Sequence, residues 1–394
     1  MAYEPYYRPK LRYVEAFPME HQGKKGVLLR DPLGYSEHLL FLAAPLAPVL
    51  SMMDGRHTLR DIQTAMSRMW GRIVVLEEIS QLVASLEESL LLDSPRFWEA
   101  KKQLEDDFFR MPIRPAAHAG QAYPAQAKEA QKFREEILRS YTGSYEKRVV
   151  QALIAPHIDL RAGARCFAAA YNATIFPPGA RVVILGTGHF LESAFSVLPK
   201  PFETPWRNIP VDLAFIEDLR KEMGTDIYRH FWAHRLEHSI EFQVFFLELF
   251  ADIKIVPILC GSPETPDNKR ELEKLAKSLG KLRDAQTFFI AGVDFCHLGL
   301  RYGDSLPAQK ADKEKALNYD RMLLQKVLDL DAQGFYQTIM ESNNNYRICG
   351  FGPLFVLLKA LEGRPLKGEI LYQGVVDFDA GSIVSVAAAR LFER

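Results

Sequence analysis

The sequence predicts an α/β fold, a mostly parallel sheet flanked by helices, preceded by a small winged-helix-like α+β domain. The main observation is that strand-like and helix-like stretches alternate from about residue 112 onward, as is typical of a parallel sheet covered by helices. These strand-like stretches are also nearly continuous apolar runs, as expected where both faces of a strand are buried. The first hundred residues do not show this regular alternation of strands and helices, which predicts a separate domain.

The elements of the second domain follow from these patterns. The predicted strands are Val149–Ala155, Arg181–Leu185, Ile253–Leu259, Thr287–Ala291 and Ser382–Ala388. The predicted helices are Lys128–Tyr141, Leu213–Met223, Ser239–Phe250, Asn268–Leu279, Lys310–Leu330 and Gly352–Leu361. Together they define a domain over residues 112–394.

Residues 1–100 are predicted to form a small module of two or three short helices and a strand pair. One helix begins near Leu59, where Thr58 could cap it. A second helix is expected over Leu76–Leu92, because its apolar residues recur at intervals of three and four. The charged residues 101–111 are interpreted as a helical linker.

Composition and charge exclude several classes of partner. The net charge is −1 and no block rich in lysine or arginine is present, so nothing favours nucleic acid or an anionic membrane. The most apolar run, Leu39–Leu50, is too short to span a bilayer, and the N-terminus lacks the apolar region of a signal peptide. Four cysteines without a CxxC pair argue against a disulfide framework and a structural zinc finger. We therefore expect a cytoplasmic protein.

Metal-binding side chains follow three of the predicted strands. They are His157 and Asp159 after the first strand, His189 after the second, and Asp294, Cys296 and His297 after a third. In an open parallel sheet, ligands bind beyond the carboxyl ends of the strands, where these groups would converge. A single histidine after a strand is more often an ordinary loop or core residue, but three strand ends of this kind predict a site.

The segment before the helix at Ser239 adds more histidines. His230, His234 and His238 lie four residues apart and would share one face of a helix, although no acid separates the first two as in HExxH. For His230 and His234 an exposed histidine face is the simpler interpretation. His238 follows Glu237 at the start of an apolar helix, where a polar first turn can point into a site.

The predicted metal ligands are His157, His189 and Cys296, which leave a coordination position open. Two imidazoles and a thiolate suit iron, copper or zinc. A neighbouring histidine, His238 or His297, could transfer protons near neutral pH.

Asp294 is expected either as a further ligand or as a partner of one. The remaining candidates for the pocket are His118, Asp159, Glu237 and Cys349, which stand in polar clusters within otherwise apolar sequence. Each of these is more often an ordinary loop residue when taken alone.

Seven ordered motifs make the second domain resemble the Memo family, in the form called AmmeMemoRadiSam system protein B. They are HAGQAYP (118–124), IAPHIDLRAG (154–163), LGTGHF (185–190), EHSIEFQVFFL (237–247), IVPILCG (255–261), VDFCHLGLRYGD (293–304) and ICGFGPLFVLL (348–358). The resemblance implies a fold similar to class III extradiol dioxygenases, which are non-haem iron enzymes. It also implies a metal, iron (Fe²⁺) first and copper next, on His157, His189 and Cys296, with His238 in the pocket and redox chemistry on a substrate that the family does not identify.

Residues 1–100 resemble PqqD-like modules more faintly, through DGRHTLRDI (54–62) and SPRF (94–97). Such modules bind a peptide by adding a strand to a sheet edge. The resemblances imply radical-SAM and AMMECR-like proteins as partners; the chain lacks the CxxxCxxC motif and is not itself the radical-SAM component. The leading hypothesis is thus an oxygenase-like metalloprotein, and the alternatives are a non-catalytic module that binds a peptide or phospholigand, and a zinc-dependent hydrolase.

Overall fold

The computed structural model describes residues 3–143 and 145–394. The chain divides into two compact units, an N-terminal unit that ends at Met111 and a C-terminal unit from Pro112 to Arg394. Among the described residues, no helix is both long enough and apolar enough to cross a membrane.

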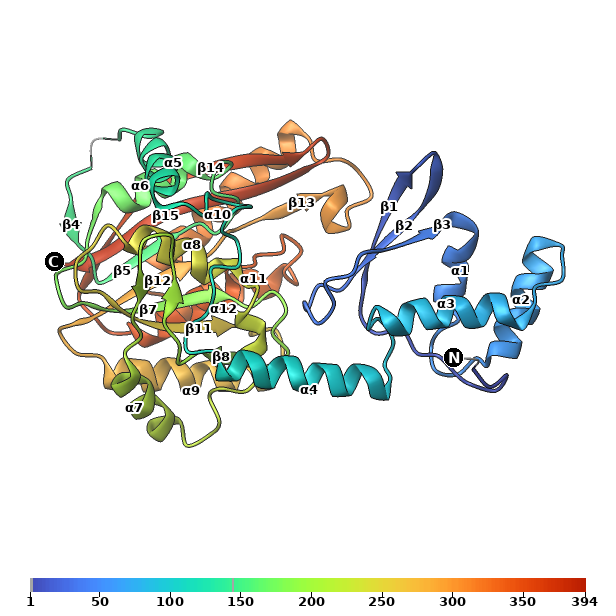
Figure 1. Cartoon of the computed structure of the whole chain (residues 1–394). Helices are drawn as coiled ribbons and strands as arrows, with labels where there is room; N and C mark the ends of the chain where they lie inside the picture. The colour runs from blue at the N-terminus through green and yellow to red at the C-terminus, as the bar shows by residue number, and fades with distance from the viewer. Residues whose placement is uncertain (1–2, 144) are drawn as a thin grey trace. The chain divides into compact units, whose positions relative to one another are not determined.

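The N-terminal unit combines a small antiparallel sheet with helices (Figure 1). Its strands are β1 (Glu15–His21), β2 (Lys24–Arg30) and β3 (Leu40–Ala43), paired in that order. Its helices are α1 (Ala47–Leu50), α2 (Leu59–Trp70), α3 (Leu76–Glu88) and α4 (Pro95–Arg110), with a 3-10 turn at Ala44–Leu46. Three strands replace the expected pair, because the apolar run after residue 39 begins with a strand and becomes helical only at its prolines.

Local signals in this unit account for its helices. Thr58 caps α2 as predicted, since its hydroxyl accepts from the backbone amide of Asp61 (3.2 Å). Helix α3 ends before the predicted boundary, at Glu88, because Leu90 adopts a left-handed φ of 54°. The charged segment 101–111 continues α4 as far as Arg110, behind a cap by Ser94.

In the described part of the C-terminal unit, an eight-stranded sheet has the order β13-β15-β5-β12-β7-β11-β8, with β14 paired to β15. The strands are β5 (Ala152–Ala155), β7 (Arg181–Thr187), β8 (Phe195–Val197), β11 (Lys254–Cys260), β12 (Thr287–Gly292), β13 (His297–Gly299), β14 (Leu366–Asp379) and β15 (Ser382–Glu393). Strands β5, β12, β7 and β11 are mutually parallel, and the outer strands are antiparallel. The prediction of a mostly parallel central sheet is confirmed.

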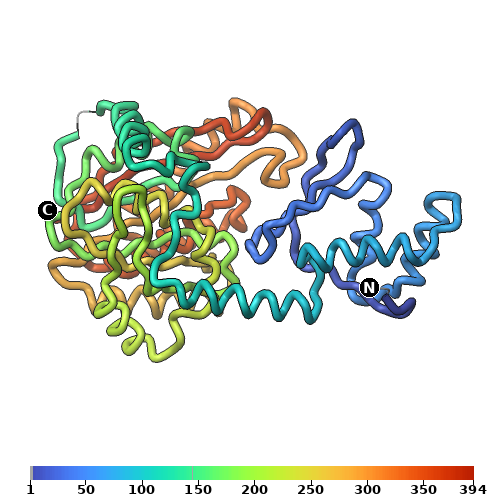
Figure 2. Tube along the Cα trace, in the orientation of Figure 1, coloured from blue at the N-terminus to red at the C-terminus, as the bar shows by residue number. Residues whose placement is uncertain are grey.

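Helices cover both faces of this sheet (Figure 1). They are α5 (Ala127–Arg139), α6 (Ala164–Asn172), α7 (Leu213–Met223), α8 (His238–Leu247), α9 (Pro266–Leu282), α10 (Lys310–Leu328), α11 (Ala332–Glu341) and α12 (Phe351–Ala360). Helices α7 and α9–α12 build the large apolar core on one face, and α5, α6 and α8 lie on the other. The chain path ends in the red β14–β15 hairpin (Figure 2).

Several elements differ from their predictions. The predicted strand Val149–Ala155 is two strands, because β4 (Arg148–Val149) pairs with β6 (Thr174–Ile175) while β5 joins the main sheet. A second small pair joins β9 (Phe202–Glu203) to β10 (Asn208–Ile209). Helices α6 and α11 and strand β14 were not predicted; β14 has mostly half-buried residues and therefore no continuous apolar run.

Candidate metal centre

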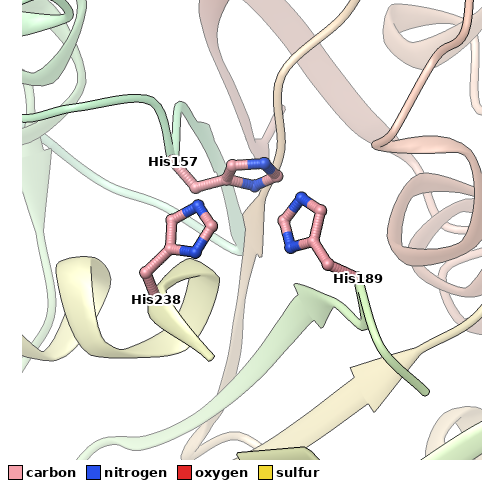
Figure 3. A group of neighbouring side chains, drawn as sticks. All are labelled: His157, His189 and His238. Atoms are coloured by element: carbon pink, nitrogen blue, oxygen red, sulfur yellow. The ribbon is translucent and has the colours of Figure 1, made fainter. Parts of the chain in front are cut away.

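Three histidines meet at the carboxyl edge of the parallel strands. His157 follows β5, His189 follows β7, and His238 is the first residue of α8. One ring nitrogen from each lies within 4.8 Å of the others, and Figure 3 shows the three rings facing one another. Two of the three predicted strand ends therefore deliver an imidazole, and the third imidazole comes from a helix N-terminus.

Each imidazole is oriented by an acceptor near its Nδ1 atom. Nδ1 of His157 lies 2.8 Å from the Gly292 carbonyl oxygen, and Nδ1 of His189 lies 3.1 Å from the Glu237 carboxylate. Nδ1 of His238 lies 3.3 Å from the same carboxylate. A neutral imidazole that donates from Nδ1 presents the lone pair of Nε2 to a metal, and Nδ1 of each of the three rings lies beside an acceptor.

Glu237 is a buried carboxylate that serves two imidazoles. It also accepts from the backbone amides of His189 (3.1 Å) and Ser239 (3.0 Å). Burial by itself would raise its pKa, but His189, His238 and the Ser239 amide together outweigh burial, and the pKa lies well below its usual range. Glu237 is therefore ionised, as a partner of metal-bound histidines should be.

Glycines at two strand ends let α8 approach the sheet closely. A Cβ atom on Gly186 would lie 2.6 Å from Ser239 Oγ, and one on Gly292 would lie 2.5 Å from the Ser239 carbonyl oxygen. Any side chain at either position would push away the first turn of α8, which carries His238. Glycines at these two strand ends therefore permit the close approach of the α8 backbone to the sheet.

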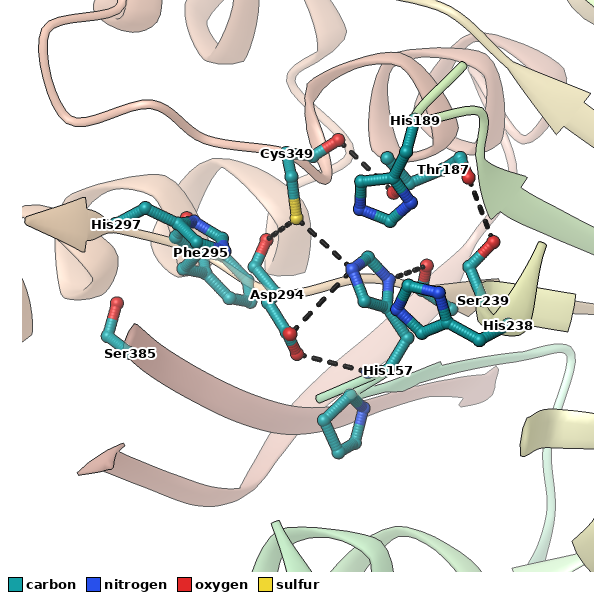
Figure 4. Close-up of polar contacts among 12 residues, drawn as sticks. His157, Thr187, His189, His238, Ser239, Asp294, Phe295, His297, Cys349 and Ser385 are labelled. Carbon is teal, nitrogen blue, oxygen red and sulfur yellow. Dashed lines mark hydrogen bonds and ion pairs between the residues drawn. The ribbon is translucent and has the colours of Figure 1, made fainter. Parts of the chain in front are cut away.

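The thiol beside the histidines belongs to Cys349, just before α12. Its Sγ lies 3.4 Å from Nε2 of His157 and 3.5 Å from the Asp294 carbonyl oxygen (Figure 4). Burial raises the pKa of this thiol, but the adjacent His157 and hydrogen bonds with His157 and His189 outweigh burial and lower it. A thiolate at this position is a soft ligand beside the imidazoles.

Cys296, the predicted thiolate ligand, points elsewhere. Its Sγ lies 3.0 Å from Oδ1 of Asp320 on α10, within the large apolar core, and burial raises the pKa of this thiol. Ser385 of β15 holds the backbone of Cys296 in this orientation: the Cys296 amide donates to Ser385 Oγ (2.8 Å) and the Ser385 amide donates to the Cys296 carbonyl (2.9 Å). In the structure, the group that could hold a metal is therefore His157, His189 and His238, with Cys349 beside it, whereas Cys296 lies away from this group.

Asp294 and His297 lie beside the histidines. Asp294 accepts from the backbone amide of His157 (3.0 Å), and burial raises its pKa to about 6. Nδ1 of His297 lies 2.9 Å from the Phe295 carbonyl oxygen, and burial lowers the pKa of its ring. Both residues line a cavity of about 500 Å³ that also borders the three histidines and Cys349.

The other predicted pocket residues have different roles. The His118 ring lies 5.9 Å from that of His238, and its Nε2 lies 3.0 Å from the Leu236 carbonyl oxygen. Asp159 borders the cavity, but its Oδ1 accepts from two backbone amides of the following turn. Both residues lie near the three histidines but do not belong to the group that could hold a metal.

The expected helical face of His230, His234 and His238 does not form. His230 has a left-handed φ of 58° and is exposed, as expected. His234 was expected to be exposed but is buried in a 3-10 turn (Phe231–His234), where its Nε2 lies 3.1 Å from the Ser196 carbonyl oxygen. Burial lowers its pKa to about 3, so it stays neutral.

Sequence reasoning missed the buried Arg114, which holds the segment that leads to His238. Its Nε donates to the His234 carbonyl (3.0 Å), Nη2 donates to the Glu237 carbonyl (2.9 Å), and Nη1 pairs with Glu241. Arg114 is fully buried, and the Glu241 carboxylate also accepts from the Tyr123 hydroxyl. No local pattern marks this arginine, because the three groups that it joins, the His234 and Glu237 carbonyls and the Glu241 carboxylate, lie more than a hundred residues away in sequence.

The donor atoms fit a single metal ion. Three imidazole nitrogens and one thiol sulfur are types of donor that iron, copper and zinc accept, whereas magnesium and calcium prefer oxygen ligands. The residues that would hold the ion are His157, His189 and His238, with Cys349 beside them.

Comparisons with known proteins agree in one family. The family model described as Memo-like protein matches residues 114–390. A MEMO1 family protein of Aquifex aeolicus is 31% identical over 380 residues, covering 94% of this chain and 97% of that protein. Similar proteins of Thermus thermophilus (29% identity, 86% of this chain, 99% of that protein) and Methanosarcina acetivorans (28%, 71% and 98%) carry the same family name. This chain belongs to the Memo-like protein family.

Proposed function

We propose that this chain is a metal-dependent enzyme with redox, oxygenase-like chemistry, and that iron (Fe²⁺) is its metal. The observation that supports this most is the convergence of three pre-oriented imidazoles on one point beside a thiol and an open cavity. Bound iron or copper supplies electron transfer and polarises a bound substrate. Zinc in the same ligands would instead support the alternative, a metal-dependent hydrolase.

The chain's own residues can bind and orient the substrate. Phe242, Tyr302 and Phe378 border the cavity and give it aromatic walls. Because Nδ1 of His297 lies against the carbonyl oxygens of Phe295 and Arg347, its Nε2 carries the free lone pair. We infer that His297 accepts a proton from the substrate at this atom.

The two cysteines provide a matched test of the centre. Full-length Cys349→Ser protein is expected to bind metal at least about 10-fold more weakly and to lose the thiolate-to-metal absorption band of the Co²⁺- or Cu²⁺-loaded protein. Cys296→Ser should keep the band, because that sulfur lies against α10. Metal titration followed by absorption spectroscopy measures both effects.

The opposite pattern, with the band lost in Cys296→Ser and kept in Cys349→Ser, would support the ligand set expected from the sequence.

Elemental analysis of protein purified without oxygen separates the two reaction classes. Iron or copper supports redox chemistry, whereas zinc alone would favour the hydrolase. If no metal binds, a non-catalytic ligand-binding role replaces both.

We further propose that the N-terminal unit recruits a peptide or a partner protein by strand addition. Among the described residues, β1 and β3 each pair with β2 alone, so the sheet has two edges on which a strand could be added. The partners to test are a radical-SAM protein and an AMMECR-like protein from the same organism. Sedimentation velocity of the full chain mixed with each is expected to show a complex; no complex with either would reject this proposal.

A further inference from the structure

A second cavity, of about 750 Å³, lies at the amino ends of the parallel strands, whereas the histidines lie at their carboxyl ends. It is lined by the segment before β5, by Phe288 near the start of β12, and by Phe392 near the end of β15. The histidines lie beyond the other ends of β5 and β7. The two sites are therefore separated by about the length of β12, roughly 20 Å at the usual rise per residue.

Three arginines border this cavity, and two of them have acidic partners. Nη2 of Arg148 lies 2.6 Å from Glu146, and Nη2 of Arg364 lies 3.3 Å from Glu393. The third, Arg283, makes no side-chain hydrogen bond or ion pair with any residue that the structure describes. Its acidic neighbour Asp284 is bound to Arg181 (2.9 Å) instead. The cavity thus contains a guanidinium without a counter-ion.

The surroundings of Arg283 make this arrangement costly. Its Nε atom is buried without a partner, and so is the Nε atom of Arg364. Burial lowers the pKa of the Arg283 guanidinium, and the like charge of Arg364 lowers it further. An anion that accepts hydrogen bonds from both guanidinium groups would offset the repulsion between their like charges.

We propose that this cavity binds an oxyanion, the phosphate or carboxylate group of a small molecule, through Arg283 and Arg364. The planar guanidinium fork matches either group in two hydrogen bonds. A cavity of about 750 Å³ is far larger than the anion alone and leaves room for the rest of a small molecule. Phe288 and Phe392 would supply an apolar wall for that part of the ligand. The site is independent of the metal centre and of the reaction proposed for it.

Calorimetric titration of the full chain with inorganic phosphate and, separately, with citrate tests the proposal. Arg283→Gln is expected to weaken the binding of the preferred anion about 10- to 100-fold, the usual effect of losing charged hydrogen bonds. The same variant should melt at a higher temperature than the unliganded wild type, because it removes a repelling charge. Tighter phosphate binding identifies a phosphorylated ligand, and tighter citrate binding identifies a carboxylate.

Two controls make the result specific. Arg270→Gln changes an exposed arginine on α9 that is paired with Asp267, and it should bind the anion like the wild type. His189→Ala should also bind it normally, since the metal centre lies at the other edge of the sheet. Equal anion affinity in Arg283→Gln and the wild type would overturn the proposal, as would the absence of binding of either anion to the wild type at millimolar concentration.

Discussion

Replacing His189 by alanine is expected to weaken metal binding by more than about 100-fold, because loss of a residue that only orients a ligand already costs about 10- to 100-fold. His189 offers one of the three imidazole nitrogens of the centre and is held by Glu237. Competition between the full-length protein and a chelator for Zn²⁺ or Fe²⁺ measures the effect.

His230→Ala is the matched control. It removes an exposed histidine of the same unit, whose Nδ1 lies 3.6 Å from Glu192, and metal affinity should stay at the wild-type value. The metal affinity of Glu237→Gln should lie between those of His189→Ala and His230→Ala, because the glutamine amide keeps the shape of the carboxylate but loses its charge. If His189→Ala bound metal with the affinity of the wild type, the assignment of the metal site to these histidines would be contradicted.

Arg114→Met is expected to lower the free energy of unfolding by about 3–5 kcal/mol, the usual cost of removing one partner from a buried ion pair. Both Arg114 and Glu241 are almost completely inaccessible to solvent. The substitution leaves the Glu241 carboxylate buried without its cation and frees the carbonyls of His234 and Glu237. Guanidinium unfolding of the full chain, followed by circular dichroism, measures the loss.

Two further variants separate this ion pair from general packing. Arg114→Met combined with Glu241→Gln should be less destabilised than the sum of the single changes, since neither charge is left alone. Arg139→Met, which breaks an exposed pair on α5, should change stability by less than about 0.5 kcal/mol. A loss of similar size in Arg114→Met and Arg139→Met would contradict the assignment.

The same pair predicts how stability depends on pH. Burial alone would raise the pKa of Glu241, but the charge of Arg114, helped by His118 and by hydrogen bonds from Tyr123 and Arg114, lowers it below the usual 4.5. A carboxylate with a lowered folded-state pKa contributes stability above its unfolded pKa, and this contribution is lost as the pH falls through the folded value. The wild type should therefore lose this contribution only in acid, as the pH falls below about 4.5 toward the lowered pKa of Glu241. The difference in stability between the wild type and Arg114→Met should be largest at neutral pH and begin to shrink above pH 4.5, because burial without the cation raises the pKa of Glu241 in the variant.

The sequence by itself determined the fold class, the parallel strands and the histidines that end them. Apolar runs predicted β7, β11 and β12 to within two residues, because burial on both faces demands such runs locally. His157 and His189 were predictable for the same reason: their place along the chain sets their place at the sheet edge. Ordered motifs identified the family without any knowledge of side-chain directions.

Only the tertiary structure showed that Cys349 and His238 are the thiol and the imidazole that lie beside His157 and His189. Cys349 lies 192 residues from His157 in sequence, and Cys296 turns away because its backbone pairs with β15. His238 reaches the centre because glycines at two strand ends admit the first turn of α8 and Arg114 holds the segment before it. The position of a residue on a strand follows from local periodicity, whereas the direction of its side chain depends on contacts between segments far apart in sequence.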